Sequence, residues 1–119
     1  MAARSTALGG REAVEAIAPP RLPDGIDTPA LLVDLDVAER NSRRLADELH
    51  SRGISLRPHA KTHKSVGLAR LQLETGSRGI TVGNLGEAEA LTVGGIDDIF
   101  VAYPIWAEGP KAARLRGYV

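Results

Sequence analysis

The fold is decided by residues 54–82, which read ISLRPHAKTHKSVGLARLQLETGSRGITV. Within this stretch Ile54–Lys61 predicts a strand, and residues 66–75 predict a helix that ends at Gly76. Gly79–Val82 predicts the next strand. A strand, a helix and a strand in this order form a βαβ unit, which implies parallel strands joined by a right-handed crossover.

The same alternation extends from this unit toward both ends of the chain. On the N-terminal side, Ala30–Leu35 is a short apolar run typical of a buried parallel strand. A helix is predicted from Asp36, which precedes Glu39 by three residues as a capping residue does, to about Arg52. On the C-terminal side the sequence predicts a helix over Gly86–Val93, a strand over Asp98–Tyr103 and a last helix with Pro110 in its first turn.

Strands that alternate with helices in this way form either an open doubly wound sheet or a closed (β/α)8 barrel. The glycine-rich turn of a dinucleotide-binding sheet is missing after the first predicted strand, where the chain reads Asp34–Val37. A barrel needs eight units and about 250 residues. The predicted fold is therefore α/β, with residues 28–119 forming about the first four βα units of a (β/α)8 barrel. Residues 1–27, rich in alanine, glycine, proline and charge, are predicted to be a flexible leader.

Composition excludes several classes of protein. The 119 residues are 43% apolar and 25% charged, which is typical of a globular domain. Fifteen basic residues balance fifteen acidic ones, so no net field favours nucleic acid or an anionic membrane. The absence of cysteine excludes disulfides and thiolate metal sites. No apolar stretch approaches the roughly 20 residues of a membrane span, and no signal core is present, so a cytoplasmic location is predicted.

The residues that carry chemistry lie in the string Leu56–Lys64, which reads LRPHAKTHK. Arg57, His59 and Lys61 alternate with small residues, so a strand would direct all three to one face near its carboxyl end. A strand face with three such groups and no acid nearby is costly unless an anion binds there. A phosphate-bearing cofactor would supply that anion, and cationic neighbours favour a lysine as a Schiff-base nucleophile.

Other interpretations of these residues are structural. A basic cluster at a strand end is also typical of a solvated loop. His59 and His63 have the spacing of zinc ligands on a helix, but Pro58 opposes a helix and no glutamate lies between them, so no metal site is predicted. His50 ends a predicted helix, where its charge would complement the helix dipole.

Two stretches, Asp27–Asp34 (DTPALLVD) and the string Leu56–Lys64, are informative about the family. Both resemble the D-threonine aldolase / D-serine dehydratase family, and the resemblance covers roughly residues 27–116. Three further stretches agree in order and spacing: Leu71–Leu73, Gly79–Glu89 and Asp97–Pro104. The resemblance implies a barrel of the alanine-racemase type in which Lys61 forms a Schiff base with pyridoxal phosphate. His59, His63 and Arg57 are the further candidate cofactor contacts, the two histidines for cofactor orientation or proton handling.

The resemblance also implies an activity on D-3-hydroxy amino acids. Aldol cleavage of D-threonine-type substrates would give glycine and an aldehyde, whereas dehydration of D-serine would give pyruvate and ammonia. A divalent metal, zinc or manganese, is expected near the substrate hydroxyl, with its ligands in a C-terminal domain that this sequence does not include. Family members are also expected to be homodimers.

Family members are much longer than this chain, so an N-terminal fragment is predicted, marginally stable and inactive alone. Its two unpaired edge strands would leave it prone to aggregation. The alternatives on the same barrel are an amino-acid racemase, which carries a different string around its lysine, and a non-catalytic pyridoxal-phosphate carrier. A (β/α) fragment without a ligand is the remaining alternative.

Overall fold

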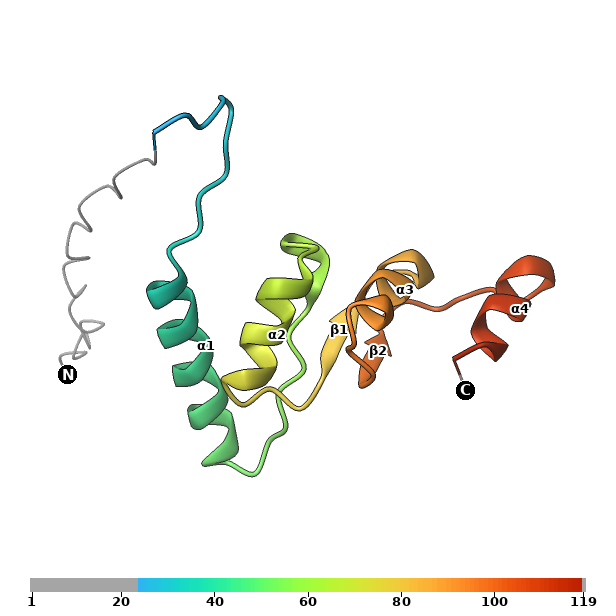
Figure 1. The fold of residues 1–119 in the computed structure, drawn as a ribbon. Coiled ribbons are helices and arrows are strands. Elements are labelled where there is room, and N and C mark those ends of the chain that lie inside the picture. The colour runs from blue at the N-terminus through green and yellow to red at the C-terminus, as the bar shows by residue number, and fades with distance from the viewer. Residues whose placement is uncertain (1–23, 119) are drawn as a thin grey trace, which may run out of the picture. The chain divides into compact units, whose positions relative to one another are not determined.

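The computed structural model describes residues 24–118, and the chain divides into two units, residues 1–32 and residues 33–119. In the first unit, residues 24–32 form a turn, bends and extended chain, and all of them are exposed. Most of the predicted leader, residues 1–23, lies outside the described residues. Figure 1 labels the helices and strands, all of which belong to the second unit.

The strand predicted over Ala30–Leu35 is wrong for this structure. Residues 30–34 have neither helical nor strand structure, and Leu31 is 91% exposed. An apolar run becomes a strand only where a neighbour satisfies its backbone N–H and C=O groups. Within residues 24–118, no strand pairs with this run.

The first helix, α1 (Leu35–His50), begins one residue earlier than predicted. Its N-cap is Asp34, whose Oδ1 accepts a hydrogen bond from the Val37 N–H at 3.0 Å. Asp36 was predicted as the cap but lies in the first turn, where a carboxylate complements the helix dipole. The helix ends at His50. In the turn that follows, Gly53 has a φ of +71°, a value that favours glycine.

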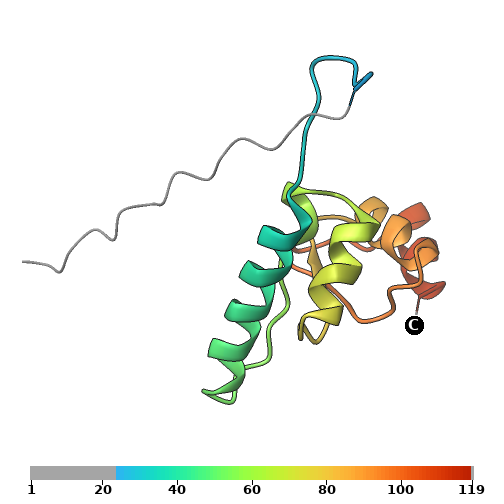
Figure 2. The ribbon, with the colours of Figure 1, turned by 60° about the vertical axis from the view of Figure 1, so that its left-hand side comes forward.

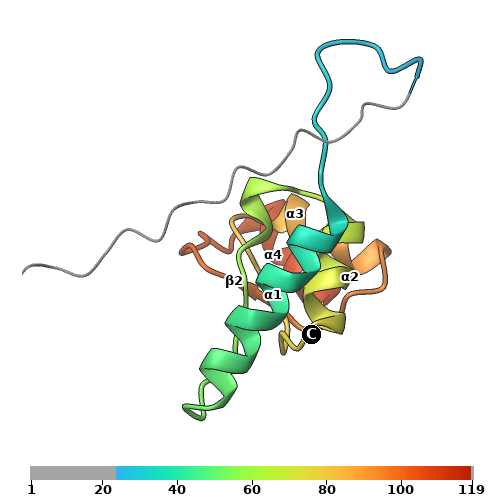
Figure 3. The ribbon, with the colours of Figure 1, turned by 90° about the vertical axis from the view of Figure 1, so that its left-hand side faces the viewer.

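The second helix, α2 (Val66–Glu74), confirms the helix predicted over residues 66–75 and lies beside α1, as Figures 2 and 3 show. The hydroxyl of Thr75 donates to that of Ser42 at 2.8 Å, which ties the end of α2 to α1. Ala46 is completely buried at this contact, and a Cβ on Gly76 would lie 3.2 Å from the Ala46 Cβ. A glycine therefore allows the two elements to approach closely.

A parallel two-stranded sheet follows, with strands β1 (Ile80–Val82) and β2 (Ile99–Val101) in register from Ile80 with Ile99. Helix α3 (Leu85–Val93) connects them, and α4 (Gly109–Arg116) comes after β2. The predicted α/β class and the parallel pairing are confirmed. The closed barrel stays a prediction, because the described residues form a sheet of two strands.

The strand predicted over Ile54–Lys61 is only partly right. The chain runs parallel to β1 at one bridge, His59 with Thr81, and the Thr81 N–H donates to the Pro58 carbonyl at 2.8 Å. Pro58 has no N–H to donate in return, which weakens a ladder at this point. The chain then turns into a short 3-10 helix, η1 (Ala60–Thr62), so Lys61 does not continue the strand.

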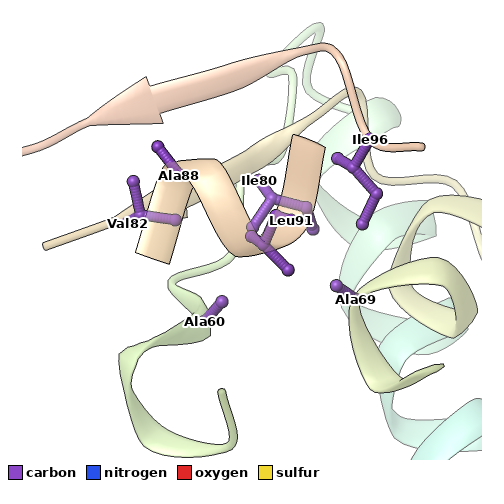
Figure 4. Close-up of a cluster of buried hydrophobic side chains, with 7 residues drawn as sticks. All are labelled: Ala60, Ala69, Ile80, Val82, Ala88, Leu91 and Ile96. Carbon is purple, nitrogen blue, oxygen red and sulfur yellow. The ribbon is translucent and has the colours of Figure 1, made fainter. Parts of the chain in front are cut away.

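The core lies between α3 and the sheet (Figure 4). Ala88 and Leu91 of α3 lie against Ile80 and Val82 of β1, both of which are fully buried. The cluster is completed by one residue each from η1, α2 and the loop before β2: Ala60, Ala69 and Ile96. This packing fixes the position of η1 against the sheet. Among the described helices, none is long and apolar enough to cross a membrane.

Candidate functional site

The carboxyl ends of the parallel segments meet at one edge of the sheet, and η1 lies at that edge. His59 is the N-cap of η1, and its Nδ1 accepts a hydrogen bond from the Lys61 N–H at 3.2 Å. Because Nδ1 accepts, the ring proton of this imidazole is on Nε2. That Nε2 atom is buried and has no hydrogen-bond partner among the described residues. The edge therefore presents a buried donor that lacks an acceptor.

Tyr103, which follows β2, lies beside His59. The two ring centroids are 6.4 Å apart and the rings are tilted by 52°. A Cβ at Gly83, directly after β1, would lie 3.3 Å from the Tyr103 ring, so a glycine there leaves space for the ring. Sequence reasoning did not propose Tyr103 as a site residue. Its position just after a predicted strand was the available signal.

Lys61 occupies the middle of η1 and is exposed. Within residues 24–118, its amine has no carboxylate within 4.0 Å. Its backbone N–H is held by His59, so the turn that carries the lysine is fixed by the neighbouring histidine. An exposed primary amine on a fixed turn can act as a nucleophile toward an aldehyde.

His63 is directed to a different part of the molecule. Its Nδ1 accepts a hydrogen bond from the Ser65 N–H at 3.1 Å, next to the start of α2. The residue lines a cavity of about 290 Å³ with apolar side chains of α1 and α2, including Leu45 and Leu68. His63 Nε2 is also buried without a partner in the described part of the chain. The structure thus pairs His59 with Tyr103 but places His63 against the helices.

Arg57 is held by an acid. Its guanidinium forms two hydrogen bonds with Asp98, of which the Nη2–Oδ2 distance is 2.8 Å. The hydrogen bonds from Arg57 lower the pKa of the Asp98 carboxyl, and the same bonds raise the pKa of Arg57. The expectation that no acid lies near the three predicted cations is therefore wrong for Arg57.

Glu87, in the first turn of α3, is a further residue that sequence reasoning missed. Its Oε2 accepts a hydrogen bond from the Gly83 N–H at 2.9 Å, and its Oε1 lies 3.4 Å from the Lys64 amine. These contacts, the Gly83 bond first, lower the pKa of the Glu87 carboxyl. The side chain is 15% exposed. No local pattern signals this contact, because Lys64 and Glu87 are far apart in sequence.

The described residues do not fit a metal ion. Across residues 24–118, no three histidine, cysteine, aspartate or glutamate side chains lie close enough to hold one. The histidines of the string are separated as described above, and their Nδ1 atoms are engaged by backbone N–H groups. No chemical step is therefore assigned to a metal at these residues.

Known proteins with similar sequences identify the family of this chain. No family model matches the chain. The D-threo-3-hydroxyaspartate dehydratase of Delftia sp. (strain HT23) is 42% identical over 92 residues, which are 76% of this chain and 24% of that protein. The D-threonine aldolase of Arthrobacter sp. is 36% identical over 106 residues, 86% of this chain and 27% of that protein. The D-serine dehydratase of Dictyostelium discoideum is 33% identical over 87 residues, 69% of this chain and 22% of that protein.

The chain belongs to the D-threonine aldolase / D-serine dehydratase family. The solved structure of the Delftia dehydratase superposes on 78% of this chain and 25% of that chain, with a TM-score of 0.72 and 41% sequence identity. The family predicted from the string Leu56–Lys64 is thereby confirmed. The chain spans about a quarter of the length of the family members that it matches.

Proposed function

We propose that this chain supplies the lysine-bearing part of a pyridoxal-phosphate-dependent lyase that acts on D-3-hydroxy amino acids. The observation that carries the proposal is Lys61, an exposed amine without a carboxylate partner in the described residues, on a turn fixed by His59. The reaction is either aldol cleavage or dehydration, because its relatives are named as aldolases and dehydratases. Residues 28–119 would form about the first four βα units of a (β/α)8 barrel of the alanine-racemase type.

The residues at the carboxyl edge of the sheet fit pyridoxal phosphate. The cofactor carries an aldehyde, for which Lys61 offers a primary amine. It also carries oxygen acceptors, one of which would satisfy the buried His59 Nε2–H that lacks a partner in residues 24–118. When bound, the cofactor withdraws electrons from the substrate's α-carbon, which permits loss of a proton or cleavage of the bond to the β-carbon.

The chain's own residues would position that chemistry. His59 would hold the backbone of Lys61 through Nδ1 and donate from Nε2 to the cofactor. Tyr103 would limit the tilt of the His59 ring. His63 would stabilise the start of α2 through Ser65, with a role in proton handling as the second assignment. Arg57 would reach a cofactor phosphate only by leaving Asp98.

The experiment that tests the proposal is chemical trapping of the cofactor. The 119-residue chain is mixed with pyridoxal phosphate, reduced with borohydride and digested, and the pyridoxyl group is located by peptide mass spectrometry. The sequence has three lysines, Lys61, Lys64 and Lys111, so the assignment is unambiguous. We expect a stoichiometric label on Lys61 that Lys61→Ala abolishes and the control Lys111→Ala retains. Equal labelling of the three lysines would contradict the proposal.

Catalytic turnover by the 119-residue chain is tested separately from cofactor binding. Because the chain spans about a quarter of the length of its relatives, we expect no cleavage of D-threonine by the 119 residues alone. The measurement is release of glycine and acetaldehyde in the presence of pyridoxal phosphate and a divalent cation. Release at rates typical of enzymes would show that the chain suffices. For the functional enzyme we propose a homodimer in the cytoplasm.

A further inference from the structure

Two lysines lie three residues apart in the string, and the structure gives them different surroundings. Lys64 lies 3.4 Å from the Glu87 carboxylate, whereas Lys61 has no carboxylate within 4.0 Å in the described part of the chain. We propose that Glu87 is a positioning residue that engages Lys64 and so leaves Lys61 as the reactive amine of the string. This inference rests on the function proposed above and adds the residue that determines which lysine reacts.

The backbone between the two lysines supports this division. Lys64 has a φ of +49°, in the left-handed region that residues other than glycine rarely adopt. Its N–H donates to the Ala60 carbonyl at 2.8 Å, which closes the turn after η1. Lys64 and Glu87 both line a cavity of about 290 Å³ between η1 and α3. The unusual backbone thus accompanies a Lys64 side chain that is directed to α3.

Glu87 is itself held in place. Its other oxygen accepts the Gly83 N–H at 2.9 Å, directly after β1, and its side chain is 15% exposed. The N–H of Glu87 is bound by Asn84 Oδ1 at 2.9 Å, which begins α3. One carboxylate therefore ties the loop after η1 to the end of β1.

The chemistry explains why this contact selects one lysine. An amine condenses with an aldehyde through its unprotonated lone pair, forming one C=N bond and releasing one water. The Glu87 carboxylate holds the Lys64 amine at 3.4 Å, and this contact must break before that amine can reach an aldehyde. Lys61 has no such contact to break, because no carboxylate lies within 4.0 Å of it in residues 24–118. Because the Lys64 side chain is 66% exposed, water competes for this contact, and we expect Glu87 to slow the reaction of Lys64 without preventing it.

The test is competitive reductive methylation with formaldehyde and cyanoborohydride, which uses the same amine chemistry but needs no cofactor site. The full 119-residue chain is labelled together with a free lysine derivative as a rate standard, and each lysine is quantified by peptide mass spectrometry. In the unmodified sequence we expect Lys64 to react more slowly than Lys61. In Glu87→Gln we expect the rate at Lys64 to rise by about twofold to fivefold, with Lys61 unchanged.

A matched control is available on the same helix. Glu89 is two residues from Glu87 and pairs with Arg114 instead of a lysine. Glu89→Gln removes the same charge and is expected to leave the Lys64 rate unchanged. A Lys64 rate that does not move in Glu87→Gln, or that moves equally in Glu89→Gln, overturns the proposal.

A salt titration tests the contact without any substitution. Because Lys64 is largely exposed, about 1 M sodium chloride should screen the ion pair and raise the Lys64 rate toward that of Lys61. A Lys64 rate that is independent of salt would count against the proposal even if Glu87→Gln does not fold. The cofactor-trapping experiment is independent of this one: if no lysine took a pyridoxyl label while the methylation rates followed the expected pattern, the proposed function would be contradicted and the role of Glu87 would stand.

Discussion

Arg57 and Asp98 form a two-armed ion pair between residues that are 41 positions apart in the sequence. The pair joins the extended segment before η1 to the residue that precedes β2, and the Asp98 carbonyl also accepts the Ile80 N–H at 2.9 Å. A guanidinium matches a carboxylate at two points, which fixes their relative orientation as well as their distance. The contact therefore aligns three successive parallel segments of the chain.

Asp98→Asn is expected to destabilise the chain in a manner that depends on pH. The Arg57 hydrogen bonds lower the folded-state pKa of Asp98 below its unfolded value of about 4. A group with a lowered folded pKa contributes stability that is complete above the unfolded pKa and is lost as the pH falls through the folded pKa. The difference in free energy of unfolding between the two proteins should thus be largest at pH 7 and shrink as the pH falls through the folded-state pKa of Asp98. Urea unfolding at pH 7 and at a series of pH values below about 4 measures it.

The control for this prediction is the adjacent residue. Asp97 is exposed and forms no ion pair within residues 24–118. Asp97→Asn should leave the unfolding midpoint at pH 7 close to that of the unmodified chain. If both substitutions lowered the midpoint equally, the Arg57 contact would not be the cause.

Gly79→Ala should destabilise the chain by about 1–3 kcal/mol, because the new Cβ would overlap its neighbours. The added atom would lie 2.5 Å from the Asp98 carbonyl oxygen and would also clash with the Arg57 guanidinium. The matched control is Gly67→Ala in α2, where the nearest atom outside the helix backbone is 3.7 Å away. Alanine is the better helix former by up to about 1 kcal/mol, so the control should be neutral or stabilising. Opposite signs in urea unfolding are the expected result.

Leu91→Ala should cost about 2–5 kcal/mol, because it leaves a cavity in the core between α3 and β1. Leu91 is 4% exposed and packs with the cluster drawn in Figure 4. Val93, two residues further along the same helix, is 90% exposed. Val93→Ala should change stability by less than about 0.5 kcal/mol. Similar losses in both variants would mean that α3 is not packed as described.

Local signals in the sequence were sufficient for the middle of the chain. The helices α2 and α3 and the strands β1 and β2 were predicted to within two residues of their observed bounds. Each is marked by its own neighbours: Ser65 and Asn84 cap the two helices, and glycines follow them. The α/β class followed from these signals alone, whereas Lys61, predicted as the last residue of a strand, lies in η1.

What the sequence did not predict depends on residues that are distant along the chain. Arg57 was expected to face a cofactor, but its partner Asp98 comes four elements later in the chain, after η1, α2, β1 and α3. The contact of Lys64 with Glu87 likewise joins residues that are distant in the sequence. The start of α1 was misassigned because aspartate, a common N-cap residue, stands at both 34 and 36, and only the structure shows that Asp34 is the cap.

Asn84→Ala is expected to destabilise the chain by about 1 kcal/mol, since Asn84 Oδ1 is the acceptor for the Glu87 N–H at the start of α3. Asn84→Asp keeps a capping oxygen and places a negative charge at the positive end of the helix, so it should retain the stability of the unmodified chain. Thermal unfolding of the two variants measures this difference. Because the cap also orients Glu87, Asn84→Ala should raise the methylation rate of Lys64, whereas Asn84→Asp should not. A loss of stability in Asn84→Ala without any change at Lys64 would show that Glu87 keeps its contact independently of the cap.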